Sequence, residues 1–139
     1  MTAQNVAVAA ADAKTAALAF ERVTCAFAGK TPGERYTAVA DTSLVVEAGQ
    51  FVSVVGPTGC GKSTLLNVAA GLLAPSSGQA LIDGKPLAGI NARAGYMFQT
   101  EALMPWRNAL DNVTAGLEFR GVARADAVRR AHEWLARVG

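Results

Sequence analysis

Five short segments of the chain have the apolar and polar pattern of a β-strand. Leu18 to Phe27 alternates in part, and Ser43 to Glu47 is rich in residues that favour strands. Phe51 to Val55 is a continuous apolar run, typical of a strand buried inside a sheet. Gln79 to Ile82 and Gly95 to Phe98 predict two more short strands. The run at Phe51 to Val55 leads directly into a glycine-rich turn.

Helical periodicity follows that turn and returns near the end of the chain. Lys62 to Leu72 predicts a helix that Gly71 and Pro75 end. Asn108 is a suitable N-cap for a second helix that continues to about Phe119. After Gly121 the sequence predicts a last helix that is amphipathic. Trp134 belongs to its apolar face, and we expect this side chain to pack against a neighbouring element. That face comprises Ala127, Val128, Ala131, Trp134, Leu135 and Val138.

Composition places these elements in one globular unit. The chain has 139 residues, of which 51% are hydrophobic. Its positive and negative side chains nearly balance, with 13 Lys and Arg and 11 Asp and Glu. The sequence contains no basic stripe of the kind that indicates a nucleic-acid partner. Two cysteines cannot form a disulfide framework, so Cys25 is expected to be a small buried side chain. The alanine-rich segment 1–17 lacks signal-peptide features and is expected to be a disordered leader, and no apolar run is long enough to cross a membrane.

The strongest motif is a phosphate-binding loop between the third predicted strand and the first predicted helix. It matches G-x-x-x-x-G-K-S/T without a mismatch. Glycines let consecutive backbone N–H groups form a concave anion site at the start of a helix. In such a loop Lys62 reaches the β- and γ-phosphates, and the Ser63 hydroxyl binds Mg²⁺. The nucleotide-binding residues are Gly56, Pro57, Thr58, Gly59, Cys60, Gly61, Lys62, Ser63 and Thr64.

Cys60 lies inside this loop, near the start of a helix. A redox role for this residue is one hypothesis, because a helix N-terminus lowers a thiol pKa. We expect instead that Cys60 is a small side chain tolerated at a variable position of the loop.

The surrounding sequence resembles the ATPases of ABC transporters. Val54 to Leu72, V-V-G-P-T-G-C-G-K-S-T-L-L-N-V-A-A-G-L, is similar to their Walker A region. Ser77 to Gly84 resembles the strand and turn that follow in this family, and Gly95 to Gln99, G-Y-M-F-Q, resembles its Q-loop. Gln99 to Val113 is similar to the branch that imports nitrate, sulfonate and taurine.

The resemblance implies an α/β fold of the P-loop NTPase class. Its parts are an ABC-type catalytic-core portion with an antiparallel β region over 18–98, and a Q-loop with the start of a helical subdomain over 99–139. It implies ATP and Mg²⁺ as cofactors and a catalytic role for Lys62. By the same resemblance Gln99 is a catalytic glutamine and a Mg²⁺ ligand. An aromatic ring stacks on adenine in this family, and either Phe27 or Tyr36 suits that role.

The family's partners follow from the same resemblance. These are transmembrane permease subunits, a second ATPase subunit in a homodimer and, indirectly, a periplasmic solute-binding protein, at the cytoplasmic face of the bacterial inner membrane. Pro105 and Trp106 follow the Q-loop, where the family docks on its permease, although core packing of Trp106 is equally compatible with the sequence.

The family's L-S-G-G-Q signature, Walker B aspartate and glutamate, and switch histidine do not occur in these 139 residues. We therefore expect an N-terminal fragment that does not hydrolyse ATP efficiently by itself. A nucleotide-binding module without turnover is the first alternative. The second is another P-loop NTPase with Asp83 as its Mg²⁺ ligand, although Asp83 and Gly84 are better explained as a turn.

Overall fold

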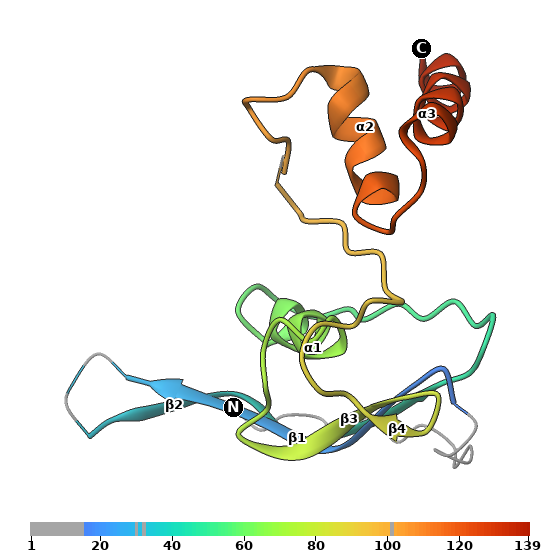
Figure 1. Ribbon diagram of the computed structural model, residues 1–139. Helices are drawn as coiled ribbons and strands as arrows, with labels where there is room; N and C mark the ends of the chain where they lie inside the picture. The colour runs from blue at the N-terminus through green and yellow to red at the C-terminus, as the bar shows by residue number, and fades with distance from the viewer. Residues whose placement is uncertain (1–15, 30, 32, 101) are drawn as a thin grey trace. The chain divides into compact units, whose positions relative to one another are not determined.

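The computed structural model describes residues 16–29, 31, 33–100 and 102–139. These residues form two compact units, one ending at Gly95 and the other spanning Tyr96–Gly139 (Figure 1). The expected leader over 1–17 lies outside the described residues, apart from Ala16 and Ala17.

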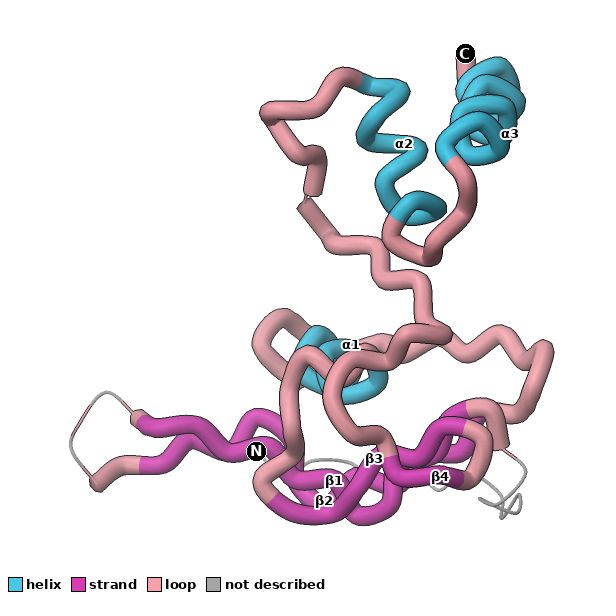
Figure 2. Tube along the Cα trace, viewed as in Figure 1, coloured by secondary structure: helices cyan, strands magenta, loops and turns pink. Residues whose placement is uncertain are grey.

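A four-stranded antiparallel sheet forms the base of the first unit. Its strands are β1 (Leu18–Ala28), β2 (Arg35–Val46), β3 (Ser77–Ile82) and β4 (Lys85–Pro86), in the order β2-β1-β3-β4 (Figure 2). β1 and β3 confirm the strands predicted for these segments. β2 begins earlier than the predicted segment, because β1 offers pairing partners back to Arg35.

The turn between β3 and β4 confirms the prediction made for Asp83 and Gly84. Both residues have positive φ, 48° and 72°, and they connect the paired residues Ile82 and Lys85. Two central residues with positive φ define a type I′ hairpin turn, in which Asp followed by Gly is a favoured pair.

Helix α1 (Lys62–Ala69) covers one face of this sheet (Figure 1). Its Val68 joins a core of buried side chains from three strands, with Leu65 and Ala69 packed against it. Cys25 is buried here as predicted, and desolvation raises the pKa of its thiol. The core comprises Phe20, Val23, Cys25, Val39, Val68 and Ala80.

The end of α1 is fixed by a later segment of the chain. The Asn91 side chain donates to the carbonyl oxygen of Ala69 at 3.1 Å, and its backbone N–H donates to that of Ala70 at 2.9 Å. Gly71 has a φ of 71°, and a Cβ there would lie 1.9 Å from the Gly89 carbonyl oxygen. Glycine therefore ends α1 for both conformational and steric reasons.

Two predicted strands are absent from the described structure. Phe51–Val55 and Gly95–Phe98 have no strand pairing, and the Phe51 side chain is 94% exposed. The first was predicted from a continuous apolar run, a pattern typical of a strand that has neighbours on both sides. The described strands pair only among themselves, through antiparallel contacts, so neither segment has a partner for its backbone groups.

The second unit is a pair of helices, α2 (Ala109–Glu118) and α3 (Arg124–Val138) (Figure 2). The Asn108 side chain accepts the Asp111 N–H at 2.8 Å, which confirms the predicted N-cap. Gly121, at a φ of 78°, lies in the connection between the helices. The residues buried between them are small: Thr114, Ala115, Ala127 and Ala131.

The prediction that Trp134 packs on a neighbouring element is wrong for this structure. Its side chain is 58% exposed, and the Arg137 guanidinium lies 4.9 Å from the ring centroid. On the α3 face Ala127 and Ala131 are buried, Val128 and Leu135 are half-buried, and Trp134 and Val138 stay exposed. None of the helices within the described ranges is long and apolar enough to cross a bilayer.

Candidate nucleotide-binding site

The phosphate-binding loop has the backbone that its glycines predict. Gly59 and Gly61 have φ values of 82° and 94°, in the left-handed region that other residues rarely adopt. A Cβ on Gly61 would also lie 2.4 Å from the Ala38 carbonyl oxygen of β2. A Cβ on Gly56 would lie 2.8 Å from the Cys60 sulfur. The loop is therefore folded tightly against itself and against β2.

Helix α1 begins at the end of this loop with its backbone donors free of side-chain caps. Gly61 is the N-cap residue, which has no side chain to accept a hydrogen bond, and no acidic residue lies in the first turn. Ser63 and Thr64 occupy that turn, and Ser63 is exposed. The first N–H groups and the positive end of the helix dipole are thus available to an anion.

Lys62 binds the loop's own carbonyl oxygens. Its Nζ atom donates to the carbonyl oxygens of Gly56 at 2.8 Å and Pro57 at 2.7 Å. The Cys60 sulfur lies 3.5 Å from the same atom. The ammonium group is therefore held over the loop, beside the uncapped helix start.

The two aromatic candidates for adenine stacking are neighbours across two strands. Phe27 of β1 pairs in register with Tyr36 of β2, and their side chains are 40% and 55% exposed. The Tyr36 hydroxyl donates to the Gly59 carbonyl oxygen at 3.3 Å. The sequence alone did not predict this contact, because it depends on how β2 lies beside the loop.

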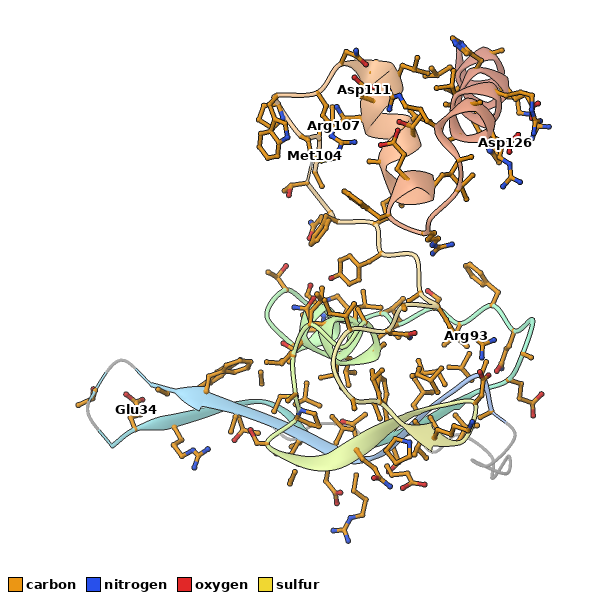
Figure 3. All side chains as sticks on the ribbon, in the orientation of Figure 1. Glu34, Arg93, Met104, Arg107, Asp111 and Asp126 are labelled. Atoms are coloured by element: carbon orange, nitrogen blue, oxygen red, sulfur yellow. The ribbon has the colours of Figure 1, made fainter. Side chains whose placement is uncertain are left out.

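The remaining predicted site residues belong to the second unit. Gln99 is exposed and lies before α2. Trp106 is 79% exposed, which argues against the core-packing interpretation of its side chain in this unit. Figure 3 shows Met104 and Arg107, which flank Pro105 and Trp106, on the segment that leads into α2.

An open depression elsewhere in the first unit does not include any residue of the phosphate-binding loop. The Arg22 side chain donates to the Asp41 carboxylate there at 3.0 Å, so the two charges satisfy each other in solvent. The residues that line it are Glu21, Arg22, Thr24, Asp41, Ser77, Gly78 and Gln79.

The loop's groups suit a magnesium nucleotide. The uncapped amides and Lys62 match phosphate oxygens, and the Ser63 hydroxyl is a hard oxygen ligand of the type Mg²⁺ accepts. Over 16–29, 31, 33–100 and 102–139, no group of three His, Cys, Asp or Glu side chains is placed to hold a metal by itself.

Comparison with known proteins identifies a family for most of this chain. Residues 39–139 match the model of the ABC transporter family. The taurine import ATP-binding protein TauB of Pseudomonas aeruginosa strain UCBPP-PA14 is 48% identical over 107 residues, which cover 77% of this chain and 41% of that protein. The uncharacterized ABC transporter ATP-binding protein MJ0412 of Methanocaldococcus jannaschii is 43% identical over 107 residues, which cover 77% and 40%.

A solved structure shares the fold. The ATP-binding cassette MJ0796, in a dimeric post-hydrolysis state bound to ADP and Pi, matches with a TM-score of 0.73 and 30% identity, over 84% of this chain and 54% of that one. The chain spans 41% of the length of TauB. Because the family model matches most of its residues, the chain belongs to the ABC transporter family, and it shares the fold of the cassette MJ0796.

Proposed function

We propose that this chain is the N-terminal part of the ATP-binding subunit of an ABC importer, and that it binds MgATP at residues 56–64. The observation that carries the proposal is the uncapped start of α1, with Lys62 held over a glycine loop. The transported solute is a small molecule of the nitrate, sulfonate or taurine class. Relatives named for taurine import support this class.

The residues of the loop divide the work of binding. Lys62 exchanges the carbonyl oxygens of Gly56 and Pro57 for phosphate oxygens, which are stronger acceptors because they are charged. The loop amides hold the remaining phosphate oxygens, and the hydroxyl of Ser63 binds Mg²⁺. Gln99 would be a further Mg²⁺ ligand and would respond to the γ-phosphate. When bound, MgATP supplies the phosphoanhydride bond that is hydrolysed.

The two parts of the chain have separate roles in this proposal. Residues 18–98 are the catalytic-core portion, and residues 99–139 are the Q-loop and the start of the helical subdomain. The exposed Trp106 docks on a transmembrane permease subunit, since an exposed indole is a strong interface anchor. A second ATP-binding subunit and a periplasmic solute-binding protein complete the transporter at the cytoplasmic face of the membrane.

Turnover needs residues beyond these 139. No group of this chain is proposed to polarise the attacking water, so the chain by itself binds nucleotide without hydrolysing it efficiently. Asp83 is a poor substitute for the missing metal ligand. It lies in the β3–β4 turn with a φ of 48°, and its carboxylate forms an ion pair with Arg93.

Removing the Lys62 ammonium tests the nucleotide site directly. Lys62→Ala should weaken MgATP binding about tenfold to a hundredfold, because one charged hydrogen-bonding group contributes about 1.5–3 kcal/mol. Lys85→Ala is the matched control, since Lys85 is an exposed lysine of β4 in the same unit. Calorimetric titration of both variants checks this, and equal affinities would contradict the assignment of the loop.

Gln99 separates the ABC assignment from the alternative metal ligand. In a subunit that carries this sequence and the C-terminal part of its relatives, Gln99→Ala should slow ATP hydrolysis and uptake while ATP binding falls only modestly. Asp83→Asn should leave both activities nearly unchanged. If Asp83→Asn instead abolishes Mg²⁺-dependent binding, the ABC mechanism proposed here is wrong.

A further inference from the structure

The exposed Trp106 lies at the tip of a hydrogen-bonded β-turn. The Arg107 N–H donates to the Met104 carbonyl oxygen at 3.0 Å, which closes a turn over Met104–Arg107. Pro105 takes the second position of this turn, where its fixed φ is favourable, and Trp106 takes the third. The indole is 79% exposed. The turn thus holds a large apolar side chain in solvent.

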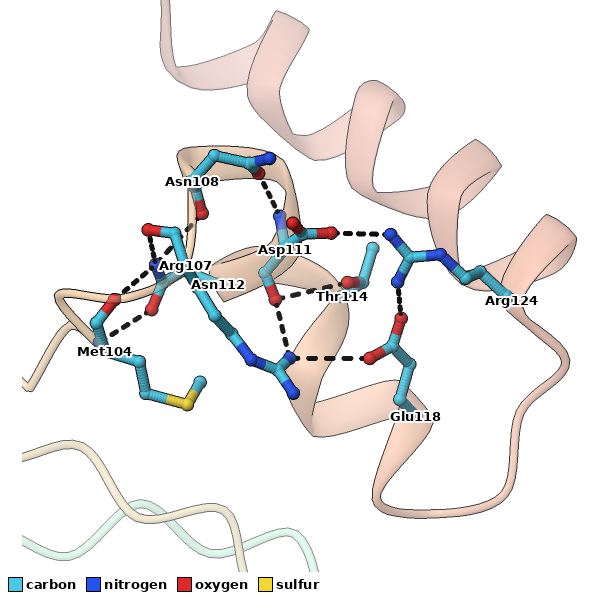
Figure 4. A network of polar contacts seen from close by, with 8 residues as sticks. All are labelled: Met104, Arg107, Asn108, Asp111, Asn112, Thr114, Glu118 and Arg124. Atoms are coloured by element: carbon cyan, nitrogen blue, oxygen red, sulfur yellow. Dashed lines mark hydrogen bonds and ion pairs between the residues drawn. The ribbon is translucent and has the colours of Figure 1, made fainter.

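One side chain of α2 binds the backbone of this turn at several points (Figure 4). The Asn112 side-chain oxygen accepts the Met104 N–H at 2.8 Å. Its amide nitrogen lies within hydrogen-bond distance of three carbonyl oxygens, those of Met104 at 3.2 Å, Arg107 at 3.1 Å and Asn108 at 3.0 Å. A primary amide is the one uncharged side-chain group that offers both an acceptor and two donors for such an arrangement.

The last residue of the turn is also tied to α2. The Arg107 guanidinium donates to the Asp111 carbonyl oxygen at 3.2 Å and to the Glu118 carboxylate at 3.4 Å. Arg124 of α3 bridges the Asp111 and Glu118 carboxylates from the other side. Arg107, at the end of the turn, is therefore hydrogen-bonded to α2 through its own side chain. Met104, at its start, is hydrogen-bonded to α2 through the Asn112 side chain.

An anchor residue binds more tightly when its backbone is ordered before binding, because less conformational entropy is then lost. We propose that Asn112 is a positioning residue that orders the Met104–Arg107 turn and so presents Trp106 to the permease. The permease as the partner rests on the proposed function above. The ordering of the turn by Asn112 does not depend on the proposed function.

The first experiment measures the order of the turn in the 139-residue chain. Trp134→Phe leaves Trp106 as the sole tryptophan, so time-resolved fluorescence anisotropy reports its local motion. In that background Asn112→Ala should raise the amplitude of the subnanosecond decay on the order of twofold. Asn112→Asp, which has the same size and lacks the two donors, should do the same.

Thr114→Ala is the matched control for a general loss of helix packing. Thr114 is buried in α2, and its hydroxyl donates to the Asp111 carbonyl oxygen at 3.2 Å rather than to the backbone of the turn. This variant should leave the anisotropy of Trp106 unchanged. An unchanged decay in Asn112→Ala, or an equal rise in Thr114→Ala, would overturn the role of Asn112.

The second experiment is a double-mutant cycle on the affinity of the assembled subunit for its permease. Trp106→Ala should weaken binding about thirtyfold, as expected for a hot-spot aromatic residue. Asn112→Ala should weaken it about twofold to tenfold, which is the cost of ordering one side chain. Together they should be no worse than Trp106→Ala alone, because Asn112 acts through Trp106.

The outcomes separate the two proposals. Additive effects of the two substitutions would show that Asn112 does not act through the indole and would overturn its positioning role in docking. If Trp106→Ala leaves permease affinity unchanged, docking through this turn is wrong and the proposed presentation to a permease is overturned. The anisotropy result then still decides whether Asn112 orders the turn.

Discussion

Lys62 satisfies its ammonium group within the loop that is expected to bind phosphate. Its hydrogen bonds to Gly56 and Pro57 fix the position of the charge before any ligand arrives. The cost is that a phosphate must replace two existing acceptors, so affinity reflects the difference between charged and neutral acceptors. The role of a single residue around the loop can therefore be tested by whether the nucleotide covers its side chain or replaces one of its hydrogen bonds.

The two cysteines should differ strongly in reactivity. Cys60 is exposed in the loop, whereas Cys25 is buried and has a raised thiol pKa. Iodoacetamide near neutral pH should modify Cys60 and spare Cys25, because only the thiolate reacts. MgATP at about 100 times its Kd should slow modification of Cys60 up to about a hundredfold, since about 1% of the sites then remain empty. Peptide mass spectrometry measures both rates, and unprotected Cys60 would place the nucleotide elsewhere.

The raised pKa of Cys25 has a consequence for stability as well. The folded state favours the neutral thiol, so this contribution is fully present below the thiol pKa of the unfolded chain. It is lost as the pH rises through the higher pKa of the folded state.

Phe27 and Tyr36 can be separated by comparing ATP with inorganic tripolyphosphate, which has no base. If Phe27 stacks on adenine, Phe27→Leu should weaken ATP binding about tenfold and leave tripolyphosphate binding unchanged. Tyr36→Phe keeps its ring and loses only the hydrogen bond to Gly59, so it should affect both ligands equally. A loss selective for ATP in Tyr36→Leu, and not in Phe27→Leu, would make Tyr36 the stacking residue.

Among the elements, the loop and α1 depend on how closely β2 approaches them. Gly59 and Gly61 have similar positive φ values, but their surroundings differ. A Cβ on Gly59 would have open space, whereas one on Gly61 would collide with the Ala38 carbonyl oxygen. Of these two glycines, Gly61 therefore combines the conformational requirement with a steric one, and Gly59 does not.

Alanine at these two glycines should separate the effects. Gly59→Ala should weaken MgATP binding about fivefold, because a left-handed alanine costs about 1 kcal/mol. Gly61→Ala should weaken it far more, since the loop must also move away from β2. Calorimetric titration measures the affinities, and circular dichroism checks that each variant folds. Equal losses would show that the contact with β2 is not rigid.

For the molecule as a whole, apolar residues divide into a small buried core and an exposed run. Val68 is 1% exposed in the core of the first unit, whereas Phe51 is 94% exposed after β2. The chain therefore presents apolar surface that most soluble domains cover, and we expect it to associate at high concentration.

Substitutions at these two positions should have opposite outcomes. Val68→Ala should lower the free energy of unfolding by about 1–3 kcal/mol, because it leaves a cavity between α1 and the sheet. Phe51→Ser should change it by less than about 0.5 kcal/mol and should reduce association. Urea unfolding and analytical ultracentrifugation measure the two properties. A large loss of stability in Phe51→Ser would mean that this residue is buried in solution.

The sequence by itself determined the local features of this protein. The N-cap at Asn108, the Asp83–Gly84 turn and the start of α1 at Lys62 depend on residues within a few positions of each other, and each was predicted. β1 and β3 also followed from their patterns, as did the buried Cys25. The phosphate loop was recognisable because its glycines and Lys62 form a contiguous motif.

Tertiary structure decided the features that need a distant partner. Phe51–Val55 has the pattern of a buried strand but forms none, because a strand requires neighbours that satisfy its backbone groups. Trp134 lies on the predicted apolar face yet remains exposed, since only Ala127 and Ala131 of α3 are fully buried. The hydrogen bond of Tyr36 to Gly59 likewise depends on how β2 lies against the loop. Local patterns specify which conformation a segment prefers, whereas burial and pairing depend on which other segments are within reach.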